Sequence, residues 1–336
     1  MSATAQLAAR PKPVQELKSR PSGVVFSLKL VVYLITLAHG IIFSLSIVPL
    51  VKTIGILLIG LMFAHGVELQ HQALHYQGFK SNKYNTFFGI LLGLPMLVSF
   101  HEYQYSHLRH HGRLGTPENK EYFDYGDQYG EGTAATAWLW VLRLSMIMHY
   151  GTFFKNVIRS VCFLRADNVN ATVSKAIRMD YMLMIVAVVL LTSVSVILHA
   201  WLIVWVWLAP LMLVAAPVHA LIEMPEHYRC DLTSTDPLRN TRTIKSNAFM
   251  TWFTNGNNYH VEHHMMPGLS MDRLQDLHHS IEGDLRHYHR TYRAFYGALL
   301  RGRLTPRAPA VESRSGAAGI ETGTETGDRL APTRSA

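Results

Sequence analysis

Four long apolar segments constrain this chain more than any other feature of its sequence. In chain order they cover residues 24–51, 54–67, 181–198 and 201–222. Lys52 and Thr53 alone separate the first two segments, and His199 and Ala200 alone separate the last two. Runs of this kind can cross roughly 30 Å of hydrocarbon as helices, and short links make hairpins of them. We therefore expect an all-α integral membrane protein with two transmembrane hairpins and four spans.

Two further segments are apolar but too short or too charged to be assigned as spans. Residues 87–100 are interrupted by Gly93 and Pro95 and are expected to be re-entrant, interfacial or buried. Residues 134–164 mix tryptophans and leucines with Arg143, Lys155 and Arg159, which is typical of an amphipathic helix at the membrane interface. If both segments crossed the bilayer, the protein would have six spans. Residues 1–23 and 305–336 are polar and are expected to be disordered tails around one membrane domain, 24–304.

Basic residues are unevenly distributed along the chain, whose formal net charge is +8. Both ends and the long loop between the hairpins carry Lys and Arg, whereas the two hairpin turns carry almost none beyond Lys52. By the positive-inside rule, both termini and the long loop are expected to be cytoplasmic, in a bacterial inner membrane. Since basic residues also collect beside membranes, the charge does not indicate nucleic-acid binding, and we expect none.

Histidine is unusually abundant, with 19 copies against 23 Asp and Glu together. Eight copies lie in an HxxxH box and two HxxHH boxes, namely His71 and His75; His107, His110 and His111; and His260, His263 and His264. One HxxxH pair is expected about once by chance in such a chain, but two HxxHH triplets are not. Ordinary surface histidines, the alternative interpretation, have no reason to repeat a spacing.

The boxes indicate metal ligation. Residues three and four apart share one face of a helix, so each box can direct imidazoles toward one centre. Adjacent histidines of a triplet point about 100° apart, which suits two metal ions better than one. Imidazole binds zinc, copper, iron and nickel, so the ligand type does not identify the metal. The chain has two cysteines, which excludes a thiolate iron–sulfur cluster and a cysteine-rich zinc module.

The three boxes in this order, around two membrane hairpins, resemble those of the membrane fatty acid desaturase and hydroxylase superfamily. The likeness covers residues 54–279, and the segment NYHVEHHMMP at 258–267 resembles the third box of acyl-lipid desaturases. The resemblance implies a non-haem di-iron centre at the cytoplasmic side of the bilayer. It also implies O₂ as co-substrate and an unactivated C–H bond of a lipid-like chain as the point of attack.

The same resemblance implies a ninth histidine. Members of the stearoyl-CoA group carry an NxxxH element after the fourth span, with a water-linked asparagine. Here the matching stretch runs from Glu223 to His227. His227 is expected in the place of the ninth ligand, and Glu223 stands where the asparagine would be. Glu223 is a candidate for direct or water-mediated ligation, and the alternative is a capping or ion-pairing role at the membrane boundary.

By this resemblance we expect an enzyme that introduces a double bond into a fatty acyl chain. The alternative is a hydroxylase of a lipid or terpenoid chain, or another C–H oxidising enzyme such as a ketolase or a terminal-alkene-forming decarboxylase. The sequence identifies no catalytic residue beyond the metal ligands. It also has no GxGxxG fingerprint and no haem-binding appendage, so electrons are expected from a separate ferredoxin or cytochrome b5-like protein.

Two competing functions fit the boxes less well. A metal transporter places its ligands at mid-membrane in broken helices, whereas these boxes lie just outside the expected spans. A zinc hydrolase needs an open coordination position, and the sequence shows no obvious general base for one. Four histidines in a charged C-terminal stretch are expected to be solvated, namely His278, His279, His287 and His289.

Overall fold

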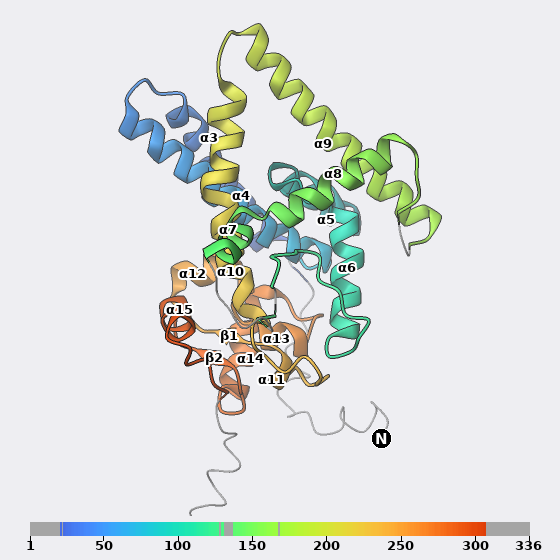
Figure 1. Ribbon diagram of the computed structural model, residues 1–336, viewed down its shortest axis with the longest axis vertical. Helices are drawn as coiled ribbons and strands as arrows, with labels where there is room; N and C mark the ends of the chain where they lie inside the picture. The colour runs from blue at the N-terminus through green and yellow to red at the C-terminus, as the bar shows by residue number, and fades with distance from the viewer. Residues whose placement is uncertain (1–20, 22, 128, 131–136, 167–168, 307–336) are drawn as a thin grey trace, which may run out of the picture.

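The computed structural model describes residues 21, 23–127, 129–130, 137–166 and 169–306. Within these residues, four helices are long and apolar enough to cross a membrane, which confirms the two expected hairpins (Figure 1). The spans are α3 (Val24–Ser44), α4 (Pro49–Leu74), α9 (Ala171–Ile197) and a fourth, Ile203–Glu226. The fourth span is continuous through η3 (Ile203–Leu208), η4 (Leu211–Ala215), α10 (Ala216–Glu223) and η5 (Met224–Glu226). Nearly all of both expected tails lies outside the described residues.

The first hairpin turns at a different place from the one the sequence predicts. The link lies between Ser44 and Pro49, and Lys52 and Thr53 belong to helix α4. Proline at the start of α4 explains the boundary, because its fixed φ and missing N–H suit the first turn of a helix. Lys52 is accommodated by the second hairpin, since its Nζ lies 4.4 Å from the ring centroid of Trp205.

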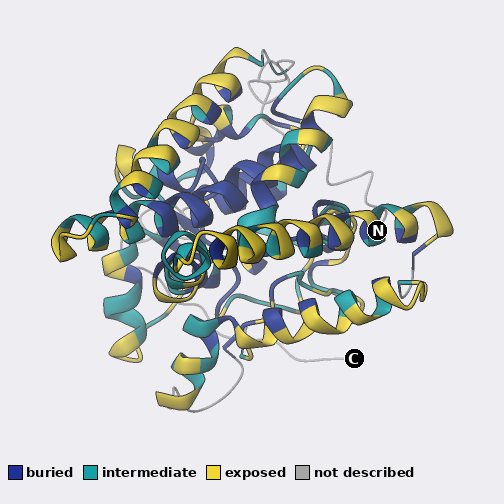
Figure 2. Ribbon diagram, turned by 90° about the horizontal axis from the view of Figure 1, so that it is seen from above, coloured by how far each residue is buried: buried dark blue, intermediate teal, exposed yellow. Residues whose placement is uncertain are grey.

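Glycines let the helices of the hairpins approach each other closely. A Cβ atom at Gly55 of α4 would lie 2.2 Å from the backbone nitrogen of Ser44, at the end of α3. A Cβ atom at Gly60 would lie 2.4 Å from the Cβ atom of Val214 in the fourth span. Small residues at such contacts are typical of helix packing in membranes. The second half of α4 is thereby buried at the centre of the molecule (Figure 2).

The segment at 87–100 forms part of a sharply bent pair of helices. Helix α5 (Asn82–Gly93) continues into η2 (Leu94–Met96), and the chain then turns by 100° into α6 (Phe100–Arg113). Ser99 caps α6 by accepting a hydrogen bond from the backbone N–H of Glu102. If the bent pair were counted as one span, the total would be five. The bend directs α6, which carries the second histidine box, away from the spans (Figure 1).

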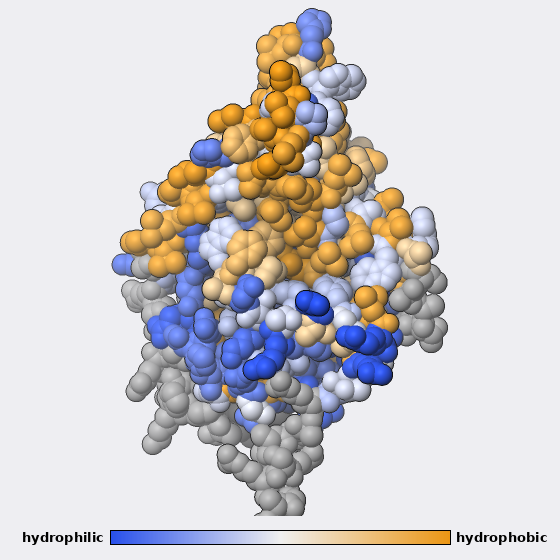
Figure 3. Space-filling model, turned by 90° about the vertical axis from the view of Figure 1, so that its left-hand side faces the viewer, coloured by the Kyte–Doolittle hydropathy of each residue, from blue (hydrophilic) through white to orange (hydrophobic). Residues whose placement is uncertain are grey.

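The segment that the sequence predicts at the membrane interface forms two short helices, α7 (Ala137–Ser145) and α8 (Ile147–Val161), with Met146 in a left-handed conformation between them. The rest of the chain forms a cap beneath the spans (Figure 1). Its elements are α11 (Pro237–Asn240), β1 (Thr243–Ile244), α12 (Ala248–Phe253), α13 (His260–Met265), η6 (Met271–Arg273), α14 (Leu274–Ile281), β2 (Tyr288–His289) and α15 (Tyr292–Leu300). Strands β1 and β2 are parallel, with Thr243 opposite Tyr288. On the face shown in Figure 3, hydrophobic residues cover the spans and hydrophilic residues cover the cap.

Candidate metal centre

All nine histidines that the sequence singles out come together where the spans meet the cap. His71 and His75 lie at the end of α4, the second box on α6, the third box on α13, and His227 directly after η5. Their ring nitrogens form two groups close enough to hold metal ions. The larger group comprises His71, His75, His107, His111 and His263. The smaller group comprises His110, His227 and His264. A further group of His227, His260 and Glu226 shares His227 with it, so that His110, His227, His260 and His264 together form a four-histidine group.

In the larger group, hydrogen bonding alone does not explain the short distances between the ring nitrogens. The Nε2 atom of His107 lies 2.7 Å from Nε2 of His71, 2.9 Å from that of His111 and 3.0 Å from that of His75. A neutral imidazole has one donor and one acceptor nitrogen, so a single nitrogen cannot serve three such neighbours. Ligands at right angles on a metal with bonds of about 2.1 Å lie roughly 3 Å apart. The spacing therefore fits a shared cation.

His263 provides an independent test of the fit. Its side chain is fully buried, yet both ring nitrogens lack a hydrogen-bond partner among the described residues. Its ring centroid lies 4.6–4.8 Å from those of His71, His75 and His111. A buried polar atom without a partner is costly, so such an atom needs an explanation. A metal ion within the group would supply the missing partner.

In the smaller group, the outer nitrogens of two rings are held by hydrogen bonds. The Nδ1 atom of His227 lies 3.0 Å from the backbone oxygen of Asn240, and Nδ1 of His260 lies 3.0 Å from the amide oxygen of Asn257. The two Nε2 atoms then face each other at 3.2 Å, and Nε2 of His264 also lies 3.2 Å from that of His260. Such contacts fix the orientation and tautomer of ligating imidazoles.

The histidines of the third box lie in surroundings that favour their neutral form. Burial, and next the neighbouring imidazoles, hold the pKa of His260, His263 and His264 well below the ordinary histidine value. A protonated imidazole cannot bind a metal, so the neutral form is the one that a metal site requires. The buried position of α13 beneath the spans therefore favours the form of these imidazoles that can bind a metal ion.

Glu121 contacts the smaller group and was not found by the sequence analysis. Its Oε1 atom lies 2.9 Å from Nδ1 of His110 and accepts a hydrogen bond from the hydroxyl of Tyr129 at 3.0 Å. Burial by itself would raise the pKa of the Glu121 carboxyl, but His110, His227 and Tyr129 together lower it to about 2. Glu121 is therefore a carboxylate that can orient a histidine and balance positive charge. It lies in an irregular segment ten residues after His111, and no local spacing marks it.

Two other carboxylates near the site did leave a signal in the sequence. Glu226 precedes His227 directly; its Oε2 lies 3.1 Å from Nε2 of His260, and its Oε1 accepts a hydrogen bond from Asn257. Glu68 follows the second apolar segment without a break and is buried within α4. An ionisable residue inside a span is by default a functional candidate.

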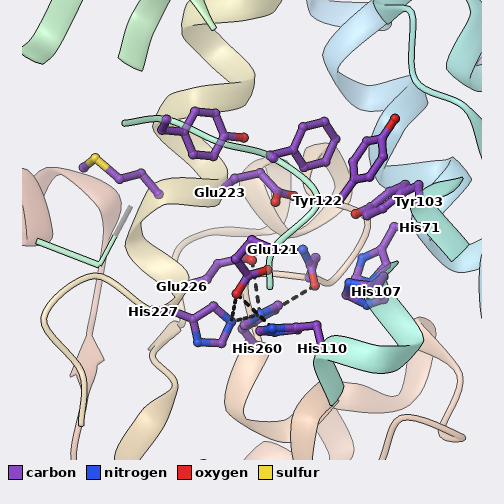
Figure 4. A pocket seen from close by; sticks show the side chains of 14 residues that line it. His71, Tyr103, His107, His110, Glu121, Tyr122, Glu223, Glu226, His227 and His260 are labelled. Carbon is purple, nitrogen blue, oxygen red and sulfur yellow. Dashed lines mark hydrogen bonds and ion pairs between the residues drawn. The ribbon is translucent and has the colours of Figure 1, made fainter. Parts of the chain in front are cut away.

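Glu223 is brought to the site, but not into either histidine group. It lines the cavity beside the histidines, together with aromatic side chains that include Tyr103 and Tyr122 (Figure 4). Its carboxylate lies instead in a separate group with the carboxylate of Glu68 and the ring of His219. The cavity measures only about 30 Å³, roughly the space of one water molecule.

The expectation that the C-terminal histidines are solvated is wrong for two of them. His278 and His287 are buried, whereas His279 is exposed and His289 is half-buried. His278 is buried because its Nδ1 binds the carboxylate of Glu262, which lies inside the third box. None of the four joins either metal group, but His278 contacts the third box through Glu262.

A comparison with protein families agrees with the boxes and the spans. The model of the family described as fatty acid desaturase matches residues 47–296, which is well over half of the chain. The matched region includes three of the four spans, all three boxes and His227. Among curated proteins, no match to the chain is found.

Proposed function

The chain belongs to the fatty acid desaturase family, and on that premise we propose that it is a membrane-bound di-iron enzyme that uses O₂ to introduce a double bond into a fatty acyl chain. One observation carries the proposal: nine buried or half-buried histidines converge in two groups where membrane-spanning helices meet the cap. Family membership makes the protein an oxidoreductase that acts on a lipid. The metal, the co-substrate and the type of product are the parts that we propose.

In this proposal the larger histidine group holds one iron. The four-histidine group, which consists of His110, His227, His260 and His264, holds the other. The two irons together would supply the activation of O₂ that an unreactive C–H bond requires. The protein's own contribution is to keep the imidazoles neutral, to orient them through Asn257, Asn240 and Glu121, and to exclude water with aromatic side chains. Glu223, at the cavity wall, is a candidate for binding a water molecule rather than a first choice as ligand.

The ends of the membrane-spanning helices next to the boxes are proposed to face the cytoplasm, in a bacterial inner membrane. The basic residues of the cap and of the loop between the hairpins favour this orientation. Electrons are proposed to come from a ferredoxin or a cytochrome b5-like protein, for which a basic cytoplasmic face is a suitable docking surface. An apolar cavity of about 320 Å³, lined by Ile222, Phe253 and Tyr292 among others, offers space for a lipid chain beside the spans.

The proposal is tested by metal and product analysis of the purified full-length protein. We expect two irons per chain, and we expect cells that express the protein to accumulate a new unsaturated fatty acid. A new hydroxylated lipid with two irons per chain would favour the hydroxylase alternative, which uses the same centre. Zinc in place of iron, with no change in the lipid profile, would contradict the proposal.

Glu121 offers a specific test of the four-histidine group. We expect Glu121→Gln to weaken iron binding there by roughly tenfold to a hundredfold, because the charge next to His110 is lost. The measurement is the iron retained per chain during dialysis against a chelator. Glu118→Gln is the matched control, since Glu118 lies in the same segment but is exposed and pairs with the exposed Arg113. Equal iron retention in the two variants would show that Glu121 does not support the centre.

A further inference from the structure

Three tyrosines form a row that leads away from the larger histidine group. The ring of Tyr103 packs on those of His71 and His107, with centroids 6.1 Å and 5.5 Å apart. The ring of Tyr122 stacks on that of Tyr103, with centroids 4.9 Å apart (Figure 4). The hydroxyl of Tyr181, on α9, lies within hydrogen-bond reach of the Tyr122 hydroxyl. This tyrosine row therefore connects the metal centre to the second hairpin.

The outer end of the tyrosine row has a proton acceptor. Tyr181 donates a hydrogen bond from its hydroxyl to Oε2 of Glu102. The side-chain amide of Asn156 donates another to Glu102 at 2.9 Å, so this carboxylate is an acceptor in both contacts. Burial raises the pKa of Glu102 and outweighs the two hydrogen bonds, which lower it. Because a carboxylate with a raised pKa binds a proton more strongly, Glu102 is suited to take the proton of Tyr181.

Burial distinguishes Tyr181 from its proton acceptor. The Tyr181 side chain is 2% exposed, whereas Glu102 is half-buried. A proton that reaches Glu102 can therefore pass on to solvent, while the ring of Tyr181 stays shielded from reactants outside the protein. The hydroxyl of Tyr122, by contrast, accepts a hydrogen bond from the backbone N–H of Ser99. Tyr181 is accordingly the member of the row from which an electron and a proton can leave together.

The proposed reaction creates a use for such a row. O₂ takes up four electrons on its reduction to two water molecules. In desaturation, two of them come from the lipid and two from the electron donor. If the oxidant forms while no lipid is bound, the two electrons of the lipid are missing. An oxidant that can break an unactivated C–H bond then lies among histidine and tyrosine side chains, and the protein has to direct this competing reaction.

We propose that the tyrosine row conducts an electron to the metal centre when no lipid is bound, and that Tyr181 is thereby oxidised to a neutral tyrosyl radical. One electron passes from Tyr181 through the rings of Tyr122 and Tyr103 to the oxidant. The O–H bond of Tyr181 breaks, and its proton passes to Glu102. The electron donor supplies the second missing electron, and a further electron from it, with the proton on Glu102, restores Tyr181.

The inference rests on the proposed function, since it takes the oxidant at the metal centre as the electron acceptor. Tyrosine gives up an electron only to a strong oxidant, so the row does not compete with the ordinary supply of electrons from the donor. Its function would be protective. It moves the oxidation from the ligating histidines to a buried side chain that the donor can restore.

The test is electron paramagnetic resonance of the iron-loaded, full-length protein. The protein is kept in a detergent whose fluorinated chain offers no C–H bond, reduced with dithionite, freed from excess reductant, mixed with O₂ and frozen. We expect the signal of an organic radical. Protein from cells grown on ring-deuterated tyrosine should give a narrower signal, which assigns the radical to tyrosine. An iron-loaded protein without a tyrosyl radical would overturn the inference.

Two variants locate the radical. Tyr181→Phe keeps the ring but has no O–H bond to break, and Glu102→Gln keeps a hydrogen-bond acceptor but cannot take the proton. Both should hold as much iron as the wild type and lose the signal. The matched control is Tyr150→Phe, because Tyr150 is buried on α8 and its hydroxyl has no hydrogen-bond partner among the described residues. The control should keep the signal, and an equal loss in all three variants would overturn the inference.

Tyr129 is the competing place for a radical, because its hydroxyl donates a hydrogen bond to Glu121 beside the metal centre. A signal that survives in Tyr181→Phe and is lost in Tyr129→Phe would therefore also overturn the inference. Mass spectrometry of peptides gives a second measurement. After repeated reduction and exposure to O₂ without lipid, Tyr181→Phe should carry more oxidised box histidines than the wild type. A variant with no added damage would show that the row does not protect the centre.

The iron content of each sample separates this inference from the proposed function. Two irons per chain without a tyrosyl radical would overturn the tyrosine row and leave the di-iron proposal standing. Zinc in place of iron would contradict the di-iron proposal, and the row would lose its oxidant with it.

Discussion

Replacing His263 with alanine is expected to remove one of the two proposed irons and to abolish lipid oxidation. His263 is the only residue of α13 in the larger group, which otherwise consists of residues from α4 and α6. Without it, the cap no longer contributes a ligand to that group. Loss of a ligand should weaken binding by more than the tenfold to hundredfold that supporting residues contribute, so more than about a hundredfold. Iron per chain and product formation by mass spectrometry are the measurements.

The matched control for this experiment is His279→Ala. His279 is also a histidine of the cap, but it is exposed and belongs to neither metal group. It should retain two irons and full activity. If His263→Ala behaved like this control, the assignment of the larger histidine group as an iron site would be wrong. A variant with two irons but no activity would instead assign His263 a role in the reaction without a role in metal binding.

The spans and the histidine boxes could be predicted because both are local properties of the sequence. Hydropathy marks a helix that is surrounded by lipid, and the spacing of a box fixes which face of a helix its side chains share. The 100° rotation between adjacent residues also anticipates how the triplets divide. His110 and His111 lie in different groups, as do His263 and His264.

The position of the first turn could not be predicted from hydropathy. Lys52 reads as a break between two apolar segments, but its ammonium group lies over the ring of Trp205 in the second hairpin. That contact joins residues 153 positions apart in the sequence, so no local pattern reports it. The proline at position 49 was the better local signal, because it marks the first turn of α4.

The supporting residues of the metal centre were missed for a similar reason. Glu121 reaches His110 from an irregular segment whose path is set by tertiary packing. His278 was expected to be solvated because its neighbours in sequence are charged, yet its partner Glu262 lies 16 residues earlier. A carboxylate between two histidines of the third box was visible in the sequence, but its contact with His278 was not.

Glu262→Ala is therefore expected to destabilise the cap strongly and to lower iron content with it. The Glu262 side chain is fully buried. Its Oε1 atom binds Nδ1 of His278 and its Oε2 atom accepts a hydrogen bond from the hydroxyl of Thr243, both at 2.5 Å. Removing one partner of such a buried pair costs roughly 3–5 kcal/mol of folding free energy. The midpoint of thermal unfolding of the purified protein should fall by several degrees.

Glu262→Gln separates the contribution of the charge from that of the hydrogen bonds. Its amide oxygen can still accept one of the two hydrogen bonds, so its unfolding midpoint should lie between those of the wild type and Glu262→Ala. The control is Asp276→Ala, which removes an exposed carboxylate of α14 that pairs with Arg273. A surface contact of this kind contributes about 1 kcal/mol or less. If Glu262→Ala unfolded at the same temperature as Asp276→Ala, the contacts of Glu262 would not stabilise the cap. Glu262 lies on α13 between His260 and His263. If the destabilised variant also lost iron from both histidine groups, the packing of α13 against α14 and β1 would be shown to position the histidines of both groups.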